Sequence, residues 1–211
     1  MAKLNVAPTK SNYLELSDQL SVAKEGYDLL EEKRQILVLE LMSRLGEAKR
    51  IEKEVHEKSA AAQDILRQAV MTVGSAGLQR LALGLSTSHQ VEIVPRRFMG
   101  LDLPTLEPQH PKEEGIPFNY SDHALIVDEL TRRFRELLRV TDKLAEIENS
   151  ILRLAREVKK TQRRVNALEK VFIPDYDETI RYIVESLEEK ERDEFVIMKM
   201  IKARLERQRG K

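Results

Sequence analysis

Thr161 to Glu169 reads TQRRVNALE and lies inside a helical pattern that runs from about residue 122 to about residue 208. Two adjacent arginines, a glutamine and an asparagine stand around the apolar Val165. Pro174 follows within about one and a half helical turns. A helix that only faces solvent does not need this arrangement. The stretch therefore predicts a buried apolar stripe with polar side chains on its flanks.

Apolar residues recur along this pattern at steps of three and four, which is the heptad spacing of a coiled coil. We expect the inward stripe to consist of Leu130, Phe134, Leu137, Thr141, Leu144, Ile147, Ile151, Leu154, Val158, Thr161, Val165, Leu168 and Phe172. The helix is predicted to start near Ser121, a good N-cap residue. Pro174 lacks a backbone donor and crowds the carbonyl of Lys170, so we expect a local kink near it.

An earlier stretch has the same spacing. Thr9, Ser11 and Asn12 are possible helix caps, and Arg34 stands where one apolar residue is expected. The apolar positions are Tyr13, Leu16, Leu20, Ala23, Tyr27, Leu30, Leu37 and Leu41, and they continue less regularly to Val73. Each long helix must bury its stripe, and the other half of the same chain is the nearest apolar surface. We therefore predict an antiparallel helical hairpin.

The connector between the two helices has a different pattern. Glycines after residue 73 interrupt the helical pattern. From Val91 to Glu107, apolar and polar residues alternate loosely around prolines, and Met99-Gly100 can form a turn. We predict a lead-in and long helix over 1–73, a connector over 74–121 and a long helix over 122–211. The expected fold is all-α: one elongated domain, a long antiparallel two-helix coiled coil with a short β-hairpin insert at about 91–107.

The composition limits the possible functions. Charged residues make up 34% of the chain and aromatic residues 5%, as in long helices and coiled coils. The 36 basic and 36 acidic residues cancel, which argues against a nucleic-acid partner. Cysteine is absent. No signal peptide or membrane-spanning run is visible, so we expect a cytoplasmic protein without direct membrane insertion.

The sequence offers no catalytic chemistry of its own. It contains no nucleotide-binding glycine motif, no zinc-protease motif and no nucleophile elbow. The four histidines, at positions 56, 89, 110 and 123, lack metal-ligand spacing. Paired glutamates lie in helical charge runs, where solvated faces explain them. We expect no catalytic residue, no metal and no cofactor.

Charge is sorted along the second helix. Residues 153–170 hold seven basic residues against two acidic ones, residues 175–194 hold nine acidic against three basic, and residues 199–211 hold six basic against one acidic. Pairing within and between the helices is one explanation, although each exposed pair contributes only about 0.3–0.5 kcal/mol. The other is a banded surface that contacts partners of complementary charge at different heights. The sequence leaves both explanations open.

Five segments, in order along almost the whole chain, resemble the D subunit of the V-type/A-type rotary ATPases. They are LNVAPTKSNYLEL (Leu4 to Leu16), GYDLLEEKR (Gly26 to Arg34), KKTQRRVNALEKVFIP (Lys159 to Pro174), DETIRYIVESLEEKERDEF (Asp177 to Phe195) and IKARLE (Ile201 to Glu206). Lys10 stands where arginine is usual in that family. The third segment is the most specific, because it is long and unlike an ordinary coiled coil.

The resemblance implies a central rotor shaft whose joined termini enter a hexamer of catalytic and non-catalytic ATPase subunits. It implies further partners: the small F subunit of the central stalk on the shaft's side and a funnel-shaped subunit on the membrane side. ATP hydrolysis would belong to the hexamer, with ion transport coupled to rotation. The expected rotor-interface residues are Arg153, Arg156, Lys159, Lys160, Arg163, Arg164, Asn166 and Glu169.

Two other functions fit the residues. One is a coiled-coil scaffold or adaptor without rotary function, which should form homodimers. The other is a regulatory helical module that binds an acidic partner through the basic residues of 153–170. A rotor should instead co-purify with a nucleotide-binding hexamer.

Overall fold

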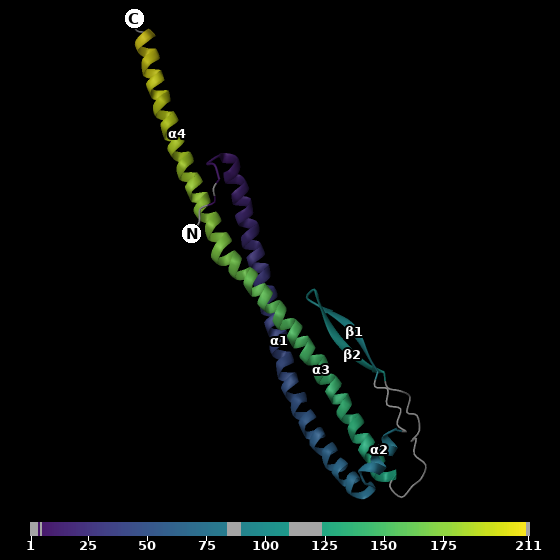
Figure 1. Cartoon of the computed structure of the whole chain (residues 1–211). Helices are drawn as coiled ribbons and strands as arrows, with labels where there is room; N and C mark the ends of the chain where they lie inside the picture. Colours follow the sequence, from purple (N-terminus) through teal and green to yellow (C-terminus); the bar gives the residue numbers. More distant parts are fainter. Residues whose placement is uncertain (1–3, 5, 84–89, 110–123, 210–211) are drawn as a thin grey trace. The chain divides into compact units, whose positions relative to one another are not determined.

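The computed structural model describes residues 4, 6–83, 90–109 and 124–209. Its elements, in order, are α1 (Lys10–Val73), α2 (Ser75–Leu83), β1 (Gln90–Phe98), β2 (Leu101–Gln109), α3 (Ala124–Ala167), the single π-helical turn η1 (Leu168–Phe172) and α4 (Ile173–Arg209) (Figure 1). Two long helical segments with an antiparallel two-stranded hairpin between them confirm the predicted fold class.

The chain divides into two compact units. The terminal unit comprises Met1–Gln35 and Lys159–Lys211, and the hairpin unit comprises Ile36–Val158. The helix α1 contributes residues to both units. Each unit has its own buried residues, as described below.

The core of the hairpin unit lies between α1, α3 and the β-hairpin. Leu37 of α1 packs in one buried cluster with Leu103 of β2 and Leu154 of α3. Further along α1, Ile51 belongs to a second cluster with Val140 and Ile147 of α3. Rising residue numbers in α1 thus meet falling numbers in α3, which makes the two helices antiparallel.

Four buried residues of α3 lie seven residues apart, as in a heptad repeat. Val140, Ile147, Leu154 and Thr161 are all buried. Phe134, Thr141 and Phe172 were predicted to lie in this stripe, and the prediction is wrong for all three, because they are exposed. For Phe134 and Thr141, which lie seven residues apart, the reason is a phase error of one residue, because Val140, one heptad before Ile147, packs inward instead of Thr141. Phe172 lies in the π turn η1, where the helical repeat changes.

The β-hairpin is closed by a two-residue turn. Met99 and Gly100 both have positive φ angles, 50° and 81°. Positive φ at both central positions is the type I′ geometry that suits the right-handed twist of paired strands. The register runs from Phe98 opposite Leu101 to Gln90 opposite Gln109.

Two hydrogen bonds and one buried side chain attach the hairpin to its unit through β2. The Leu106 amide donates to Glu146 Oε2 at 3.1 Å, and Arg153 Nη1 donates to the Asp102 carbonyl at 2.6 Å. Leu103, only 4% exposed, fills the core. Figure 1 shows β2 on the side of the hairpin nearer α3.

In the terminal unit the N-terminal lead-in lies against α4. Thr9 caps α1, because its Oγ1 accepts a hydrogen bond from the Asn12 amide at 3.3 Å. The Leu4 amide donates to the buried Thr179 Oγ1 at 3.1 Å, and that hydroxyl donates to the Asp175 carbonyl at 2.6 Å. Leu16 of α1 and Ile183 of α4 are among the buried apolar residues of this unit.

The connector contains a helix that was not predicted from the sequence. Gly74 has a φ of 80° and ends α1, since its amide still bonds to the Val70 carbonyl at 3.0 Å. α2 follows directly at Ser75. The proline-rich loop and the predicted N-cap Ser121 lie outside the described residues, and α3 begins at Ala124 in the structure.

Among the residues that the structure describes, no helix is both long and apolar enough to cross a membrane. The same residues contain no group of three or more His, Asp or Glu side chains that could hold a metal ion. His89, His110 and His123 lie outside them.

Candidate interface on the C-terminal helices

The stretch Thr161 to Glu169 places its side chains in two environments. Thr161 and Val165 are buried, with exposed fractions of 2% and 3%. Arg163, Arg164 and Glu169 are exposed. Asn166 is half-buried, and its Oδ1 accepts a hydrogen bond from Gln162 Nε2 at 2.8 Å. Asn166 is therefore held within its own helix, one turn from its donor.

The other basic candidates are distributed between the units. Lys159 and Lys160 belong to the terminal unit, whereas Arg153 and Arg156 belong to the hairpin unit. All four are exposed. Arg153 is the one whose guanidinium bonds to the β-hairpin, which gives it a structural task. This task was not predicted, because nothing near Arg153 in the sequence indicates a carbonyl 51 residues away.

The π-helical turn η1 lies immediately before Pro174. The Ile173 amide bonds to the Leu168 carbonyl, five residues earlier, instead of to a carbonyl four residues earlier. Proline cannot donate a backbone hydrogen bond, and its ring crowds the carbonyl four residues before it. A wider turn at this point relieves that crowding. Such single π turns occur frequently at functional sites. A bend of the helix axis near Pro174 stays a prediction.

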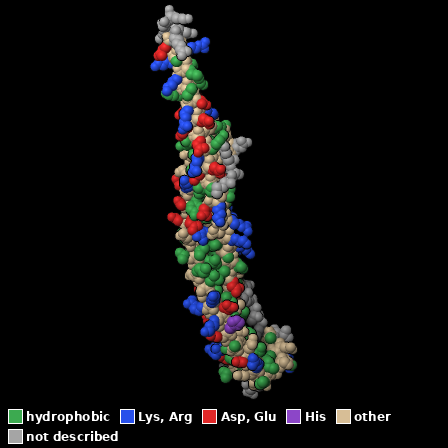
Figure 2. Space-filling view, turned by 90° about the vertical axis from the view of Figure 1, so that its left-hand side faces the viewer, with side chains coloured by type: hydrophobic (Ala, Val, Ile, Leu, Met, Phe, Trp, Pro, Cys, Tyr) green, Lys and Arg blue, Asp and Glu red, His purple; other side chains and the backbone are tan. Residues whose placement is uncertain are grey.

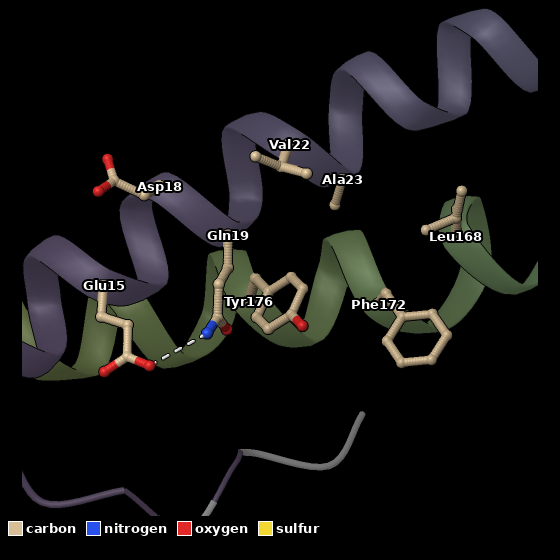
Figure 3. A pocket seen from close by; sticks show the side chains of 8 residues that line it. All are labelled: Glu15, Asp18, Gln19, Val22, Ala23, Leu168, Phe172 and Tyr176. Carbon is tan, nitrogen blue, oxygen red and sulfur yellow. Dashed lines mark hydrogen bonds between the residues drawn. The ribbon is translucent and has the colours of Figure 1, made fainter.

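An open pocket lies beside this π turn within the terminal unit. Its lining residues are Glu15, Asp18, Gln19, Val22 and Ala23 of α1, Leu168 and Phe172 of η1, and Tyr176 of α4. Figure 3 shows the Tyr176 ring and the Phe172 ring on α4 and η1 below α1, with Glu15 and Gln19 joined by a 3.3 Å hydrogen bond at one end. The pocket combines an apolar floor with two carboxylates.

The C-terminal part of α4 exposes apolar side chains among basic ones. Figure 2 shows hydrophobic and basic side chains interleaved near this end of the chain. The exposed apolar residues are Phe195, Val196, Ile197, Met198, Met200, Ile201 and Leu205. They include consecutive positions, so they cover several sides of the helix instead of one stripe. In an isolated helix these apolar side chains would stay in contact with water and would not stabilise the fold.

Arg34, the charged residue within the apolar stripe of α1, pairs with the Glu31 carboxylate one turn earlier. Arg34 Nε donates to Glu31 Oε2 at 2.7 Å, and Arg34 Nη2 donates to Glu31 Oε1. The hydrogen bond from Arg34, together with one from Gln35, lowers the pKa of Glu31 from 4.5 to about 2. A depressed pKa in the folded state means that the pair stabilises the fold above about pH 4.5 and loses this effect as the pH falls toward 2.

We expect Arg34→Gln to raise the pKa of Glu31 back toward 4.5, because it removes the charged donor. NMR titration of the Glu31 carboxyl carbon measures this directly. Thermal melts of the original chain and of Glu31→Gln should converge as the pH falls from about 4.5 to 2. A Glu31 midpoint that does not change in the Arg34 variant would contradict the pairing.

The comparisons with known proteins agree over nearly the full length. A family model described as the D subunit of ATP synthase matches residues 12–203. The D subunit of the A-type ATP synthase of Pyrococcus furiosus is 37% identical over 207 residues, which cover 96% of both chains. The D subunit of the V-type ATP synthase of Thermotoga neapolitana is 37% identical over 205 residues, covering 97% of this chain and all of that one. This chain belongs to the family of D subunits of the A-type and V-type ATP synthases.

Proposed function

We propose that the chain is the central-stalk subunit of a rotary ATPase and transmits torque between a catalytic hexamer and a membrane ion-carrying ring. The observation that carries this proposal is the match over 96% or more of the chain to relatives named as the D subunit of A-type or V-type ATP synthase. Two long helices that run antiparallel in the hairpin unit supply the length and stiffness that a shaft needs.

The proposed partners are the hexamer of catalytic and non-catalytic subunits, the small F subunit and a membrane-side funnel subunit. In this arrangement ATP binding and hydrolysis belong to the hexamer, and the chain lies on the cytoplasmic side, peripheral to the membrane. The exposed apolar side chains on several sides of α4 support such partners, because large exposed apolar surfaces mark interaction sites.

We assign the hexamer contact to the exposed charges around Thr161 to Glu169. Arg163 lies on the side of the helix opposite the buried Thr161 and Val165, and Arg164 and Glu169 are exposed on other sides of it. Lys159 and Lys160 are further exposed basic residues of the terminal unit, and Arg156 is an exposed basic residue of the hairpin unit. Asn166 and Arg153 are further candidates, and each also forms a hydrogen bond within the chain. The three catalytic sites of the hexamer are chemically equivalent. At each rotation angle of the shaft they contact different charges on it, and these different contacts give the sites different nucleotide affinities.

The double variant Arg163→Glu/Arg164→Glu should uncouple ATP hydrolysis from ion transport without unfolding the chain. The substitutions reverse two exposed charges and leave the buried Val165 in place. We expect at least about a tenfold loss in the ratio of ions transported to ATP hydrolysed in the reconstituted complex, as for loss of about 1.4 kcal/mol of differential contact. Circular dichroism should show an unchanged melting curve.

The matched control is Lys49→Glu/Arg50→Glu, which reverses two adjacent exposed charges on α1. Equal effects of both double variants would show a general charge effect instead of a local contact. Unchanged coupling in the first variant would remove the assignment. The scaffold alternative makes its own prediction: the chain would elute as a homodimer and would not co-purify with nucleotide-binding subunits.

A further inference from the structure

One edge of the β-hairpin is attached to α3, and no strand among the described residues pairs with the other edge. Two hydrogen bonds show which backbone groups point to each edge. The Leu106 amide and the Asp102 carbonyl of β2 both bond to α3 side chains. In an antiparallel strand the amide and carbonyl of one residue point to the same edge, and successive residues alternate. Even-numbered residues of β2 therefore point toward α3, and odd-numbered residues bond to β1.

The strand register shows which residues of β1 bond to β2 and which point away from it. Leu103 lies opposite Arg96 and Thr105 lies opposite Val94, so the even-numbered residues of β1 form the ladder. The odd-numbered residues Val91, Ile93, Pro95 and Arg97 direct their backbone groups outward. Pro95 lies opposite Pro104, so both prolines occupy outward positions where no amide is needed in the ladder.

The outward edge of β1 is accessible. Ile93, Pro95 and Arg97 are exposed, with fractions of 66% for Ile93 and 88% for the Arg97 side chain. Within the part of the chain that the structure describes, no backbone carbonyl outside the hairpin accepts a hydrogen bond from the amides of Val91, Ile93 and Arg97. An uncovered edge is a template for another strand, and natural proteins limit such pairing by a short or covered edge, by proline or by charge. Pro95 and Arg97 therefore restrict which strands can pair with this edge.

Charge at this edge limits the kind of strand that fits. Arg96 and Arg97 are adjacent and exposed near the turn. Arg97 Nε lies 3.4 Å from Asp102 Oδ1, and both side chains are largely solvent-exposed, so this pair is weak and replaceable. Near the middle of the strand, Ile93 offers an exposed apolar side chain. A complementary strand carries an apolar residue there and carboxylates beside the arginines.

We propose that the outer edge of β1 binds an extended acidic segment of another protein of the assembly by β-strand addition. Main-chain hydrogen bonds supply affinity in this mode, and side-chain pairs supply selectivity. The outward carbonyls of Val91, Ile93, Pro95 and Arg97 and the amides of Val91, Ile93 and Arg97 are the groups available. The inference rests on the proposed function only in locating the partner within a rotary ATPase.

Hydrogen exchange resolved at single residues tests the proposal on the free chain and on the chain within the purified assembly. We expect exchange at the Ile93 and Arg97 amides to slow at least about tenfold on assembly, as for about 1.4 kcal/mol of added protection. The amides of Val94, Arg96 and Phe98, which face β2, should show similar protection in both states. Equal exchange at Ile93 in the two states would overturn the proposal.

Substitutions at one position separate the backbone from the side chain. Ile93→Pro removes an outward amide without touching the β1–β2 ladder, whereas Ile93→Ala removes only the side chain. We expect Ile93→Pro to speed dissociation of the chain from the assembly about threefold to tenfold, the range for one net hydrogen bond, and Ile93→Ala to have a smaller effect. The exchange measurement stands even where the proline variant melts earlier.

Other outcomes are distinguishable. If the purified chain is a dimer in light scattering and Ile93→Pro makes it monomeric, the occupant is a second copy and the proposal is overturned. If Arg96→Glu weakens assembly no more than Arg139→Glu, an exposed arginine of α3, the acidic character of the partner is wrong. Failure to co-purify with nucleotide-binding subunits would count against the proposed function, whereas assembly without protection of Ile93 would count against this inference alone.

Discussion

Replacing Leu154 with alanine should lower the free energy of unfolding by about 2–5 kcal/mol, the range for deleting a large buried aliphatic side chain. Leu154 is completely buried and joins three elements, because it packs with Leu37 of α1 and Leu103 of β2. Alanine would leave a cavity at this junction. Helices and a hairpin held at several points cannot close such a cavity without losing other contacts.

Urea unfolding followed by circular dichroism measures this loss. Leu152→Ala is the matched control, because Leu152 lies two residues away on the same helix and is 53% exposed. It should change the free energy of unfolding by no more than about 0.5 kcal/mol. We also expect faster amide exchange in the hairpin of the Leu154 variant, since Leu103 loses its partner. A loss below about 1 kcal/mol would contradict the central place of Leu154 in this core.

In the terminal unit, Val165→Asp should have an effect of similar size. Val165 is 3% exposed and lies in the RRVNALE stretch, so aspartate would bring a charge into an apolar interface. A buried charge without a partner costs several kcal/mol, and we expect a destabilisation of about 3–5 kcal/mol at pH 7. Protonating the carboxyl removes the charge, so the loss should become smaller as the pH falls toward about 4.

Arg164→Asp is the control for this substitution. It introduces the same side chain one residue earlier, at an exposed position. Its effect on stability should stay within about 0.5 kcal/mol. Thermal melts of both variants at neutral and at acidic pH give the comparison. Equal destabilisation by the two substitutions would mean that Val165 does not face the interior.

Much of this fold could be predicted from periodicity. The heptad steps predicted two long helices, and the change of period after Gly74 predicted the β-hairpin, because helices and strands repeat differently. The turn at Met99-Gly100 was visible from glycine chemistry. The phase of the stripe in α3 was harder, since valine and threonine are neighbours at positions 140 and 141 and only packing against α1 decides between them.

The candidate site was only partly predictable. The exposed arginines of RRVNALE follow from their position beside Val165 on a helix. The buried Thr179 hydroxyl and the contact of Arg153 with β2 depend on partners 175 and 51 residues away. No local pattern encodes such distant partners. The π turn was also missed, although Pro174 pointed to a local distortion, because proline permits several ways of relieving its clash.

The attachment of the hairpin to α3 also limits how far α3 could move along its own axis relative to the hairpin. A regular heptad stripe tolerates displacement by one repeat, because each apolar residue then meets a position of the same kind. Glu146 and Arg153 lie one repeat apart on α3, yet one accepts a hydrogen bond from the strand and the other donates one. A one-repeat displacement would set the Arg153 guanidinium against the Leu106 amide, donor against donor. The hydrogen bonds to the hairpin therefore oppose a one-repeat displacement of α3, which apolar packing alone would tolerate.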